Sequence, residues 1–257
     1  MKRKSALILT LLISILTSFG ASAADEAQRT VLITGSNRGI GYEFVKQYTD
    51  KGYRVIATCR NPNGADELRA FAADHDNVVI EPLDLLDLEG IDALAEKYAG
   101  QPIDVLVNNG ALMRQDDGQT FGSLDYEEFD TFYNINVKGP LKVTEAFWPH
   151  VKASEEKMVA SLTTSQGRQG IPIDGFAYYK SSKAAIDNLY IDIGRRGRKE
   201  GVRVVTLIPG RVPTHGETNT KGMTPVDVSI AGMIEVMNKH ELKQNGKSFW
   251  FNGNESK

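Results

Sequence analysis

The chain has 257 residues, a formal net charge of −3 at pH 7 and 41% hydrophobic residues. This length suits one sizeable α/β domain and is too short for two comfortable ones. The ordinary apolar and charged fractions argue against disordered, fibrous and multi-pass membrane proteins. The mildly acidic balance gives no broad basic surface, so we expect no nucleic-acid partner.

The first residues have the pattern of a secretory signal. Three cations at 2–4 precede an apolar run over 6–19, and the small residues of a cleavage site follow at 21–23. Because the apolar run is shorter than the roughly 20 residues of a spanning helix, we expect residues 1–23 to be a cleaved signal peptide. An uncleaved membrane anchor is the alternative. In both cases the preceding positive charges place the folded domain outside the cytoplasm, exported to the periplasm or secreted.

The rest of the chain, 24–257, alternates short apolar runs with helical patterns. Strands that are apolar on both faces and separated by helices are typical of a parallel sheet covered on both sides. We therefore expect a single α/β domain of the doubly wound (Rossmann) type, with about seven parallel strands and helices on both faces. The expected strands are 30–34, 54–58, 77–81, 103–107, 158–162, 202–208 and 248–251, and the expected helices are 39–51, 65–73, 88–98, 137–153, 176–199 and 225–239.

Cys59 is the only cysteine of the chain. No intramolecular disulfide can form, so an oxidising compartment poses little hazard. Because Cys59 ends an apolar segment, we expect a small buried hydrophobic residue and not a reactive thiol.

The first strand leads directly into a glycine-rich turn, Thr34-Gly35-Ser36-Asn37-Arg38-Gly39-Ile40-Gly41. Glycines between a strand and a helix let the backbone approach a pyrophosphate, whose charge is then met by free N–H groups at the helix start. A glycine cluster by itself would be weak evidence. Because this one opens a strand–helix–strand unit, it predicts a dinucleotide site and not merely a tight packing turn.

Further motifs follow in the rest of the chain. They are Asp84 in PLDLLD after the third strand, the run Asn108-Asn109-Gly110-Ala111, Asn136 in NINVKG, Tyr179 with Lys183, and Pro209-Gly210 after the sixth strand. Together with the TGxxxGxG pattern of the glycine-rich turn, they resemble the short-chain dehydrogenase/reductase family. The family's NNAG motif has its last two residues exchanged here. The ending GKSFWFNG is similar to that of carbonyl-reductase-like members with short C-termini.

The resemblance implies roles for these residues. Asp84 would lie near the adenine ring, Val212 and Thr214 would meet the nicotinamide carboxamide, and Asn136 would support a proton relay through Lys183. Family members commonly form homodimers or homotetramers through the helices at 137–153 and 176–199. The cofactor-binding residues implied are Gly35, Asn37, Arg38, Gly39, Ile40, Gly41, Arg60, Asp84, Leu85, Asn109, Tyr179, Lys183, Val212 and Thr214.

The chemistry of Tyr179 and Lys183 also follows from their spacing. Residues four apart on a helix share a face, so the two side chains project together. A neighbouring ammonium favours the phenolate over the neutral phenol, whose pKa is ordinarily near 10. Tyr179 could therefore act as the acid in carbonyl reduction or the base in alcohol oxidation. Tyr178 is adjacent, but only Tyr179 has a lysine four residues on.

A hydroxyl that hydrogen-bonds the substrate oxygen has two candidates. The family places a serine in an SxxG motif at the end of the fifth strand, and counting back from Gly167 puts Thr164 in that position. Residue type favours Ser165 instead. Either hydroxyl could stabilise charge that develops on the oxygen. We favour Ser165 slightly and keep Thr164 as the alternative.

Electrostatics favours NADP(H) over NAD(H). NAD sites usually carry an acidic residue at the end of the second strand. That position is Cys59 here, followed by Arg60, and the glycine-rich turn carries Arg38. Two guanidiniums without a carboxylate suit a 2′-phosphate.

The sequence therefore predicts an oxidoreductase that uses NADP(H), with NAD less favoured, and acts on a small carbonyl or alcohol. Its expected catalytic residues are Tyr179, Lys183, Asn136 and either Ser165 or Thr164. An exported enzyme has no evident source of reduced cofactor, which motivates a second hypothesis. That alternative is an exported, non-catalytic binding protein with the dinucleotide fold, and the intact Asn136, Tyr179 and Lys183 argue against it.

Overall fold

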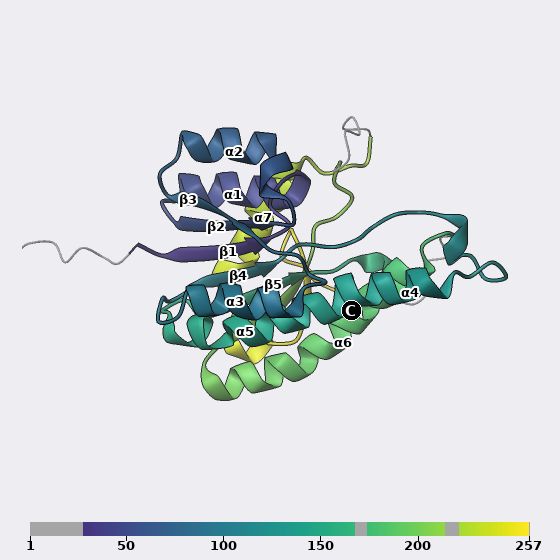
Figure 1. The fold of residues 1–257 in the computed structure, drawn as a ribbon. Coiled ribbons are helices and arrows are strands. Elements are labelled where there is room, and N and C mark those ends of the chain that lie inside the picture. Colours follow the sequence, from purple (N-terminus) through teal and green to yellow (C-terminus); the bar gives the residue numbers. More distant parts are fainter. Residues whose placement is uncertain (1–27, 168–173, 214–220, 257) are drawn as a thin grey trace, which may run out of the picture.

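A central sheet in the order β3-β2-β1-β4-β5-β6-β7-β8 organises the molecule (Figure 1). The structure is a computed structural model and describes residues 28–167, 174–213 and 221–256. The expected signal segment 1–23 and Thr214 lie outside the described residues. Within the described part, no helix is both long and apolar enough to cross a membrane.

The strands confirm the expected parallel, doubly wound sheet. Strands β1 to β7 pair in parallel. An eighth strand was not expected: after Gly253, at φ +86°, the chain returns and pairs antiparallel with β7. The strands are β1 (Thr30–Thr34), β2 (Arg54–Cys59), β3 (Val78–Pro82), β4 (Val105–Asn108), β5 (Met158–Leu162), β6 (Arg203–Ile208), β7 (Ser248–Trp250) and β8 (Glu255–Ser256).

Helices cover both faces of the sheet, as expected (Figure 1). One face packs against α1 (Gly39–Asp50), α2 (Asp66–Ala73) and α7 (Val226–Lys239). The other face packs against α3 (Leu88–Lys97), α5 (Gly139–Ala153) and α6 (Ala177–Glu200).

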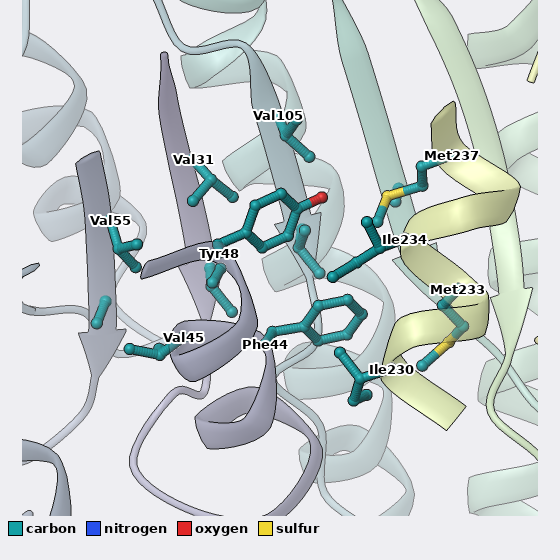
Figure 2. Close-up of a cluster of buried hydrophobic side chains, with 14 of the residues drawn as sticks. Val31, Phe44, Val45, Tyr48, Val55, Val105, Ile230, Met233, Ile234 and Met237 are labelled. Atoms are coloured by element: carbon teal, nitrogen blue, oxygen red, sulfur yellow. The ribbon is translucent and has the colours of Figure 1, made fainter. Parts of the chain in front are cut away.

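The alternation of side chains along each strand produces two separate hydrophobic clusters. Val31 and Ile33 of β1 pack toward Phe44 of α1, and Leu32 points to the opposite face, toward Phe147 of α5. Figure 2 shows the first cluster, in which Phe44 lies between the sheet and α7. Burial of such a side chain stabilises the fold by about 1.5–3 kcal/mol. Cys59 belongs to this cluster and is buried, which confirms its expected packing role.

One helix was missed by the sequence pattern. Helix α4 (Tyr126–Tyr133) precedes α5, and a π-helical turn, Asn134–Lys138, joins the two. Its aromatic residues at 126, 129, 132 and 133 have helical spacing, but α4 is only 8 residues long and the pattern covers about two turns, which is too short to identify a helix by periodicity. The expected helix 137–153 is therefore the last part of a longer helical segment.

The strand order reverses between β1 and β4, which are neighbours in the sheet. From β1 the chain continues to β2 on one side of this point, and from β4 it continues to β5 on the other side. The loops after β1 and β4 therefore diverge and leave a crevice at the carboxyl ends of the strands, where ligands bind in open α/β sheets.

Candidate functional site

The glycine-rich turn after β1 is fastened to the loop after β4. The Thr34 hydroxyl oxygen accepts hydrogen bonds from the backbone N–H groups of Asn109 and Gly110, each at 3.0 Å. The Asn109 amide donates in return to the carbonyl oxygens of Thr34 and Gly35, each at 2.9 Å. These four contacts fix the two loops at the reversal point of the sheet.

Two glycines of the turn stand where no side chain fits. Gly35 has φ +67°, and a Cβ there would lie 2.7 Å from the Gly110 Cα. A Cβ on Gly41 would lie 2.1 Å from the Gly35 carbonyl oxygen. Both distances are far shorter than real contacts allow, so the first turn of α1 and the preceding loop approach each other only because these residues are glycine.

A cleft of about 220 Å³ opens above this turn. Three segments of the expected site meet in it: the glycine-rich turn, the loop after β4 and the first turns of α6. Its lining residues include Gly35, Asn37, Arg38, Gly39, Ile40, Gly41, Asn109, Met113, Tyr179, Lys183 and Pro209. Residues distant in the sequence therefore lie together as expected.

Tyr179 and Lys183 lie on α6 and face this cleft together. The Lys183 ammonium donates a hydrogen bond to the Leu162 carbonyl oxygen at 2.9 Å, which ties α6 to the end of β5. Burial lowers the pKa of Lys183 to about 8. Burial also raises the pKa of Tyr179 to about 12, the direction opposite to the one expected from a neighbouring lysine. Burial in a medium of low dielectric disfavours the charged phenolate relative to the neutral phenol.

Asn136 is completely buried in the π-helical turn before α5. Its side-chain oxygen accepts from the Leu112 N–H at 2.7 Å, and its amide donates to the Leu112 carbonyl at 2.9 Å. The amide also donates to the Ser182 hydroxyl at 3.0 Å. Asn136 therefore joins the loop after β4 to helix α6, and it does so from a π-helical turn, a feature that is frequent at functional sites.

Both candidate hydroxyls follow the end of β5. The Thr164 hydroxyl oxygen accepts a hydrogen bond from the Gln166 N–H at 3.2 Å. Ser165 begins a short 3₁₀ turn, Ser165–Gly167. The neighbouring Thr163, which the sequence did not single out, is buried, lines the cleft and donates to the Lys183 carbonyl at 3.4 Å. Because Thr163 stands next to two other hydroxyl residues, Thr164 and Ser165, the sequence alone could not distinguish it from them.

Other expected cofactor residues surround the same edge of the sheet. Arg38 and Arg60 are exposed at the starts of α1 and of the loop after β2, and within the described residues neither guanidinium forms an ion pair. The Asp84 carboxylate accepts the Leu86 N–H at 3.0 Å, which shapes the turn after β3. Leu85 is buried and would contact a Cβ on Gly110 at 3.1 Å. Val212 is buried after β6.

Comparisons with known proteins agree with this geometry. The profile described as short chain dehydrogenase matches residues 29–224. An uncharacterized oxidoreductase of Schizosaccharomyces pombe is 30% identical over 242 residues, which cover 86% of this chain and 94% of that protein. An NADPH-dependent pterin aldehyde reductase of Arabidopsis thaliana is 27% identical, with 79% of this chain and 83% of that protein covered. The crystal structure of NADPH-bound carbonyl reductase from chicken fatty liver is similar with a TM-score of 0.82 and 31% identity, covering 89% of this chain and 98% of that one.

Proposed function

The chain belongs to the short-chain dehydrogenase/reductase family, and we propose that it uses NADP(H) to interconvert a small aldehyde or ketone and the corresponding alcohol. The observation that carries this proposal is the placement of Tyr179 and Lys183 in the cleft above the glycine-rich turn. A binding protein without a reaction has no use for a phenol and an ammonium at this position.

The residues of the turn fit a dinucleotide. The close approach of Gly35 and Gly41 leaves backbone space that any Cβ would fill, and the N-terminus of α1 points at this space. The guanidiniums of Arg38 and Arg60, which form no ion pair with any residue that the structure describes, suit the 2′-phosphate that distinguishes NADP from NAD. The NADPH named for the carbonyl reductase of chicken and the aldehyde reductase of Arabidopsis supports the same choice.

The protein side of the reaction follows from the site. NADPH, when bound, would supply the hydride. Tyr179 then donates its phenolic proton to the carbonyl oxygen, and its pKa of about 12 keeps the phenol protonated at neutral pH, as an acid for reduction requires. Lys183 would hold the ribose and provide positive charge. We assign the hydrogen bond to the substrate oxygen to Ser165, with Thr164 as the alternative.

The proposal is tested by titrating the chain from residue 24 onward with NADPH and, separately, with NADH. Cofactor fluorescence reports binding, and loss of absorbance on addition of small aldehydes and ketones reports turnover. We expect NADPH to bind more tightly than NADH and to be oxidised by at least one carbonyl compound. Ser165→Ala and Thr164→Ala, measured with that compound, identify the hydroxyl. Failure to bind either cofactor would contradict the proposal.

Arg38→Ala and Arg60→Ala are each expected to weaken NADPH binding by about tenfold, because a hydrogen bond to a charged phosphate contributes about 1.5 kcal/mol at an exposed site. NADH binding should change little, because NADH lacks the 2′-phosphate. Arg195→Ala is the control, because it removes an exposed arginine near the C-terminal end of α6, about three helical turns beyond Lys183. Equal losses for both cofactors would show that the arginines do not recognise the 2′-phosphate.

A further inference from the structure

Helix α6 begins without a cap of its own. Its first residue is Ala177, and the preceding Phe176 has no polar side chain to accept hydrogen bonds. The N–H groups at the second and third helical positions, those of Tyr178 and Tyr179, have no partner within the helix. In most helices a serine, threonine, aspartate or asparagine at the N-cap position accepts from these groups.

Gln119, about 60 residues earlier, supplies the missing cap. Its side-chain oxygen accepts the Tyr178 N–H at 3.1 Å and the Tyr179 N–H at 3.2 Å. Gln119 ends a short 3₁₀ turn in the loop after β4 and is only 1% exposed. A buried carboxamide that accepts two N–H groups of the catalytic helix is a specific contact, not a surface coincidence.

The side-chain nitrogen of Gln119 forms hydrogen bonds within its own loop. The Gln119 amide donates to the Arg114 carbonyl at 2.8 Å and lies 3.5 Å from an Asp116 carboxylate oxygen. Asp116 pairs with the Arg114 guanidinium at 2.8 Å, and this guanidinium also contacts Glu128 of α4. The Gln119 side-chain oxygen and nitrogen both therefore have hydrogen-bond partners. If the carboxamide were flipped, its N–H groups would face the N–H groups of Tyr178 and Tyr179.

The peptide groups of Tyr179 are held from both sides. Gln119 accepts its N–H, and its carbonyl oxygen accepts from the Ser182 hydroxyl at 2.8 Å. Ser182 accepts in turn from Asn136, which also holds the Leu112 backbone at the start of the same loop. The loop 112–119 is thus linked to the Tyr179 backbone at both of its ends, directly through Gln119 and, from Leu112, through Asn136 and Ser182.

We propose that Gln119 is a positioning residue for Tyr179: by capping α6 from the loop after β4, it fixes the phenol relative to the cleft. This inference rests on the proposed function, in which Tyr179 is the acid. A catalytic group displaced by about 1 Å can cost roughly 100-fold in rate, so the contact matters for turnover. Cofactor binding should depend on it little, because the glycine-rich turn and the arginines lie on other elements and Lys183 is held by its own hydrogen bond to the Leu162 carbonyl oxygen.

Gln119→Leu removes both polar ends at nearly the same volume. We expect kcat for carbonyl reduction, counted per NADPH-binding site, to fall about tenfold or more, while the Kd for NADPH stays within about twofold. Amide hydrogen exchange at Tyr178 and Tyr179, followed by NMR, should accelerate about tenfold because the N–H groups lose their acceptor. Gln119→Asn, which keeps the carboxamide on a shorter side chain, is measured in the same way if the leucine variant does not fold.

Gln115→Ala is the matched control. The Gln115 amide donates to the Asp174 carbonyl at 3.1 Å and so joins the same two segments without touching Tyr179. This variant should keep wild-type kcat and exchange rates. The proposal is overturned if the Gln119 variants keep the wild-type kcat or the wild-type amide exchange rates at Tyr178 and Tyr179. It is also overturned if NADPH binding is lost together with kcat, because that result would indicate a general structural role. A wild-type protein that binds NADPH but reduces no carbonyl overturns the proposed function, whereas the exchange measurement needs no substrate and tests the contact separately.

Discussion

Tyr179→Phe is expected to lower kcat for carbonyl reduction by about 10²–10⁴-fold, the range typical for loss of a positioned acid. The substitution removes only the phenolic oxygen, so the helix and the hydrogen bonds of the Tyr179 backbone remain. Because the glycine-rich turn and the arginines stay unchanged, the Kd for NADPH should change little. Stopped-flow or steady-state oxidation of NADPH, with fluorescence titration in parallel, separates the two quantities.

The neighbouring tyrosine provides the control for this prediction. Tyr178 is buried, and its hydroxyl has no hydrogen-bond partner among the described residues. Tyr178→Phe removes the same atom from the adjacent position and should leave kcat near the wild-type value, because loss of an unpaired hydroxyl is nearly neutral. Equal turnover by wild type and Tyr179→Phe would remove Tyr179 from the mechanism.

Gly41→Ala is expected to weaken cofactor binding. Alanine favours the helix here, so the effect is purely steric: the new Cβ would lie 2.1 Å from the Gly35 oxygen and 2.5 Å from the Asn109 amide nitrogen. The turn and the loop after β4 must separate, and overpacking of this kind costs about 1–3 kcal/mol. If that cost falls on the bound conformation, the Kd for NADPH rises by about 5- to 150-fold. Fluorescence titration measures this change.

Gly100→Ala distinguishes this steric effect from a general loss of stability. Gly100 has φ +76°, so alanine is strained there, but its Cβ would meet no atom within 4 Å. We expect a lower Tm and an unchanged Kd for NADPH in the folded protein. NADPH binding by Gly41→Ala with wild-type affinity would show that the close approach is not required for the cofactor.

Local sequence patterns predicted most of the fold. The apolar runs at β1, β2 and β4 are buried on both faces, and such runs predict a covered parallel sheet whichever strands become neighbours. The glycine-rich turn could also be identified, because its function depends on residue type at fixed spacing directly after a strand. In contrast, α4 was missed because it is only 8 residues long, so its aromatic residues repeat at helical spacing over about two turns only.

The sequence was enough to identify the candidate pair Tyr179 and Lys183, because two residues four apart need only a helix to share a face. The pKa values of the two residues could not be predicted from the sequence. Burial raises the pKa of Tyr179 and lowers that of Lys183, and this burial depends on the elements that pack around them in the folded chain. The tertiary structure also decided the role of Gln119, whose partners lie about 60 residues away on another element. A hydrogen bond between distant segments leaves no periodicity or spacing in the chain, so it becomes visible only when the sheet brings those segments together.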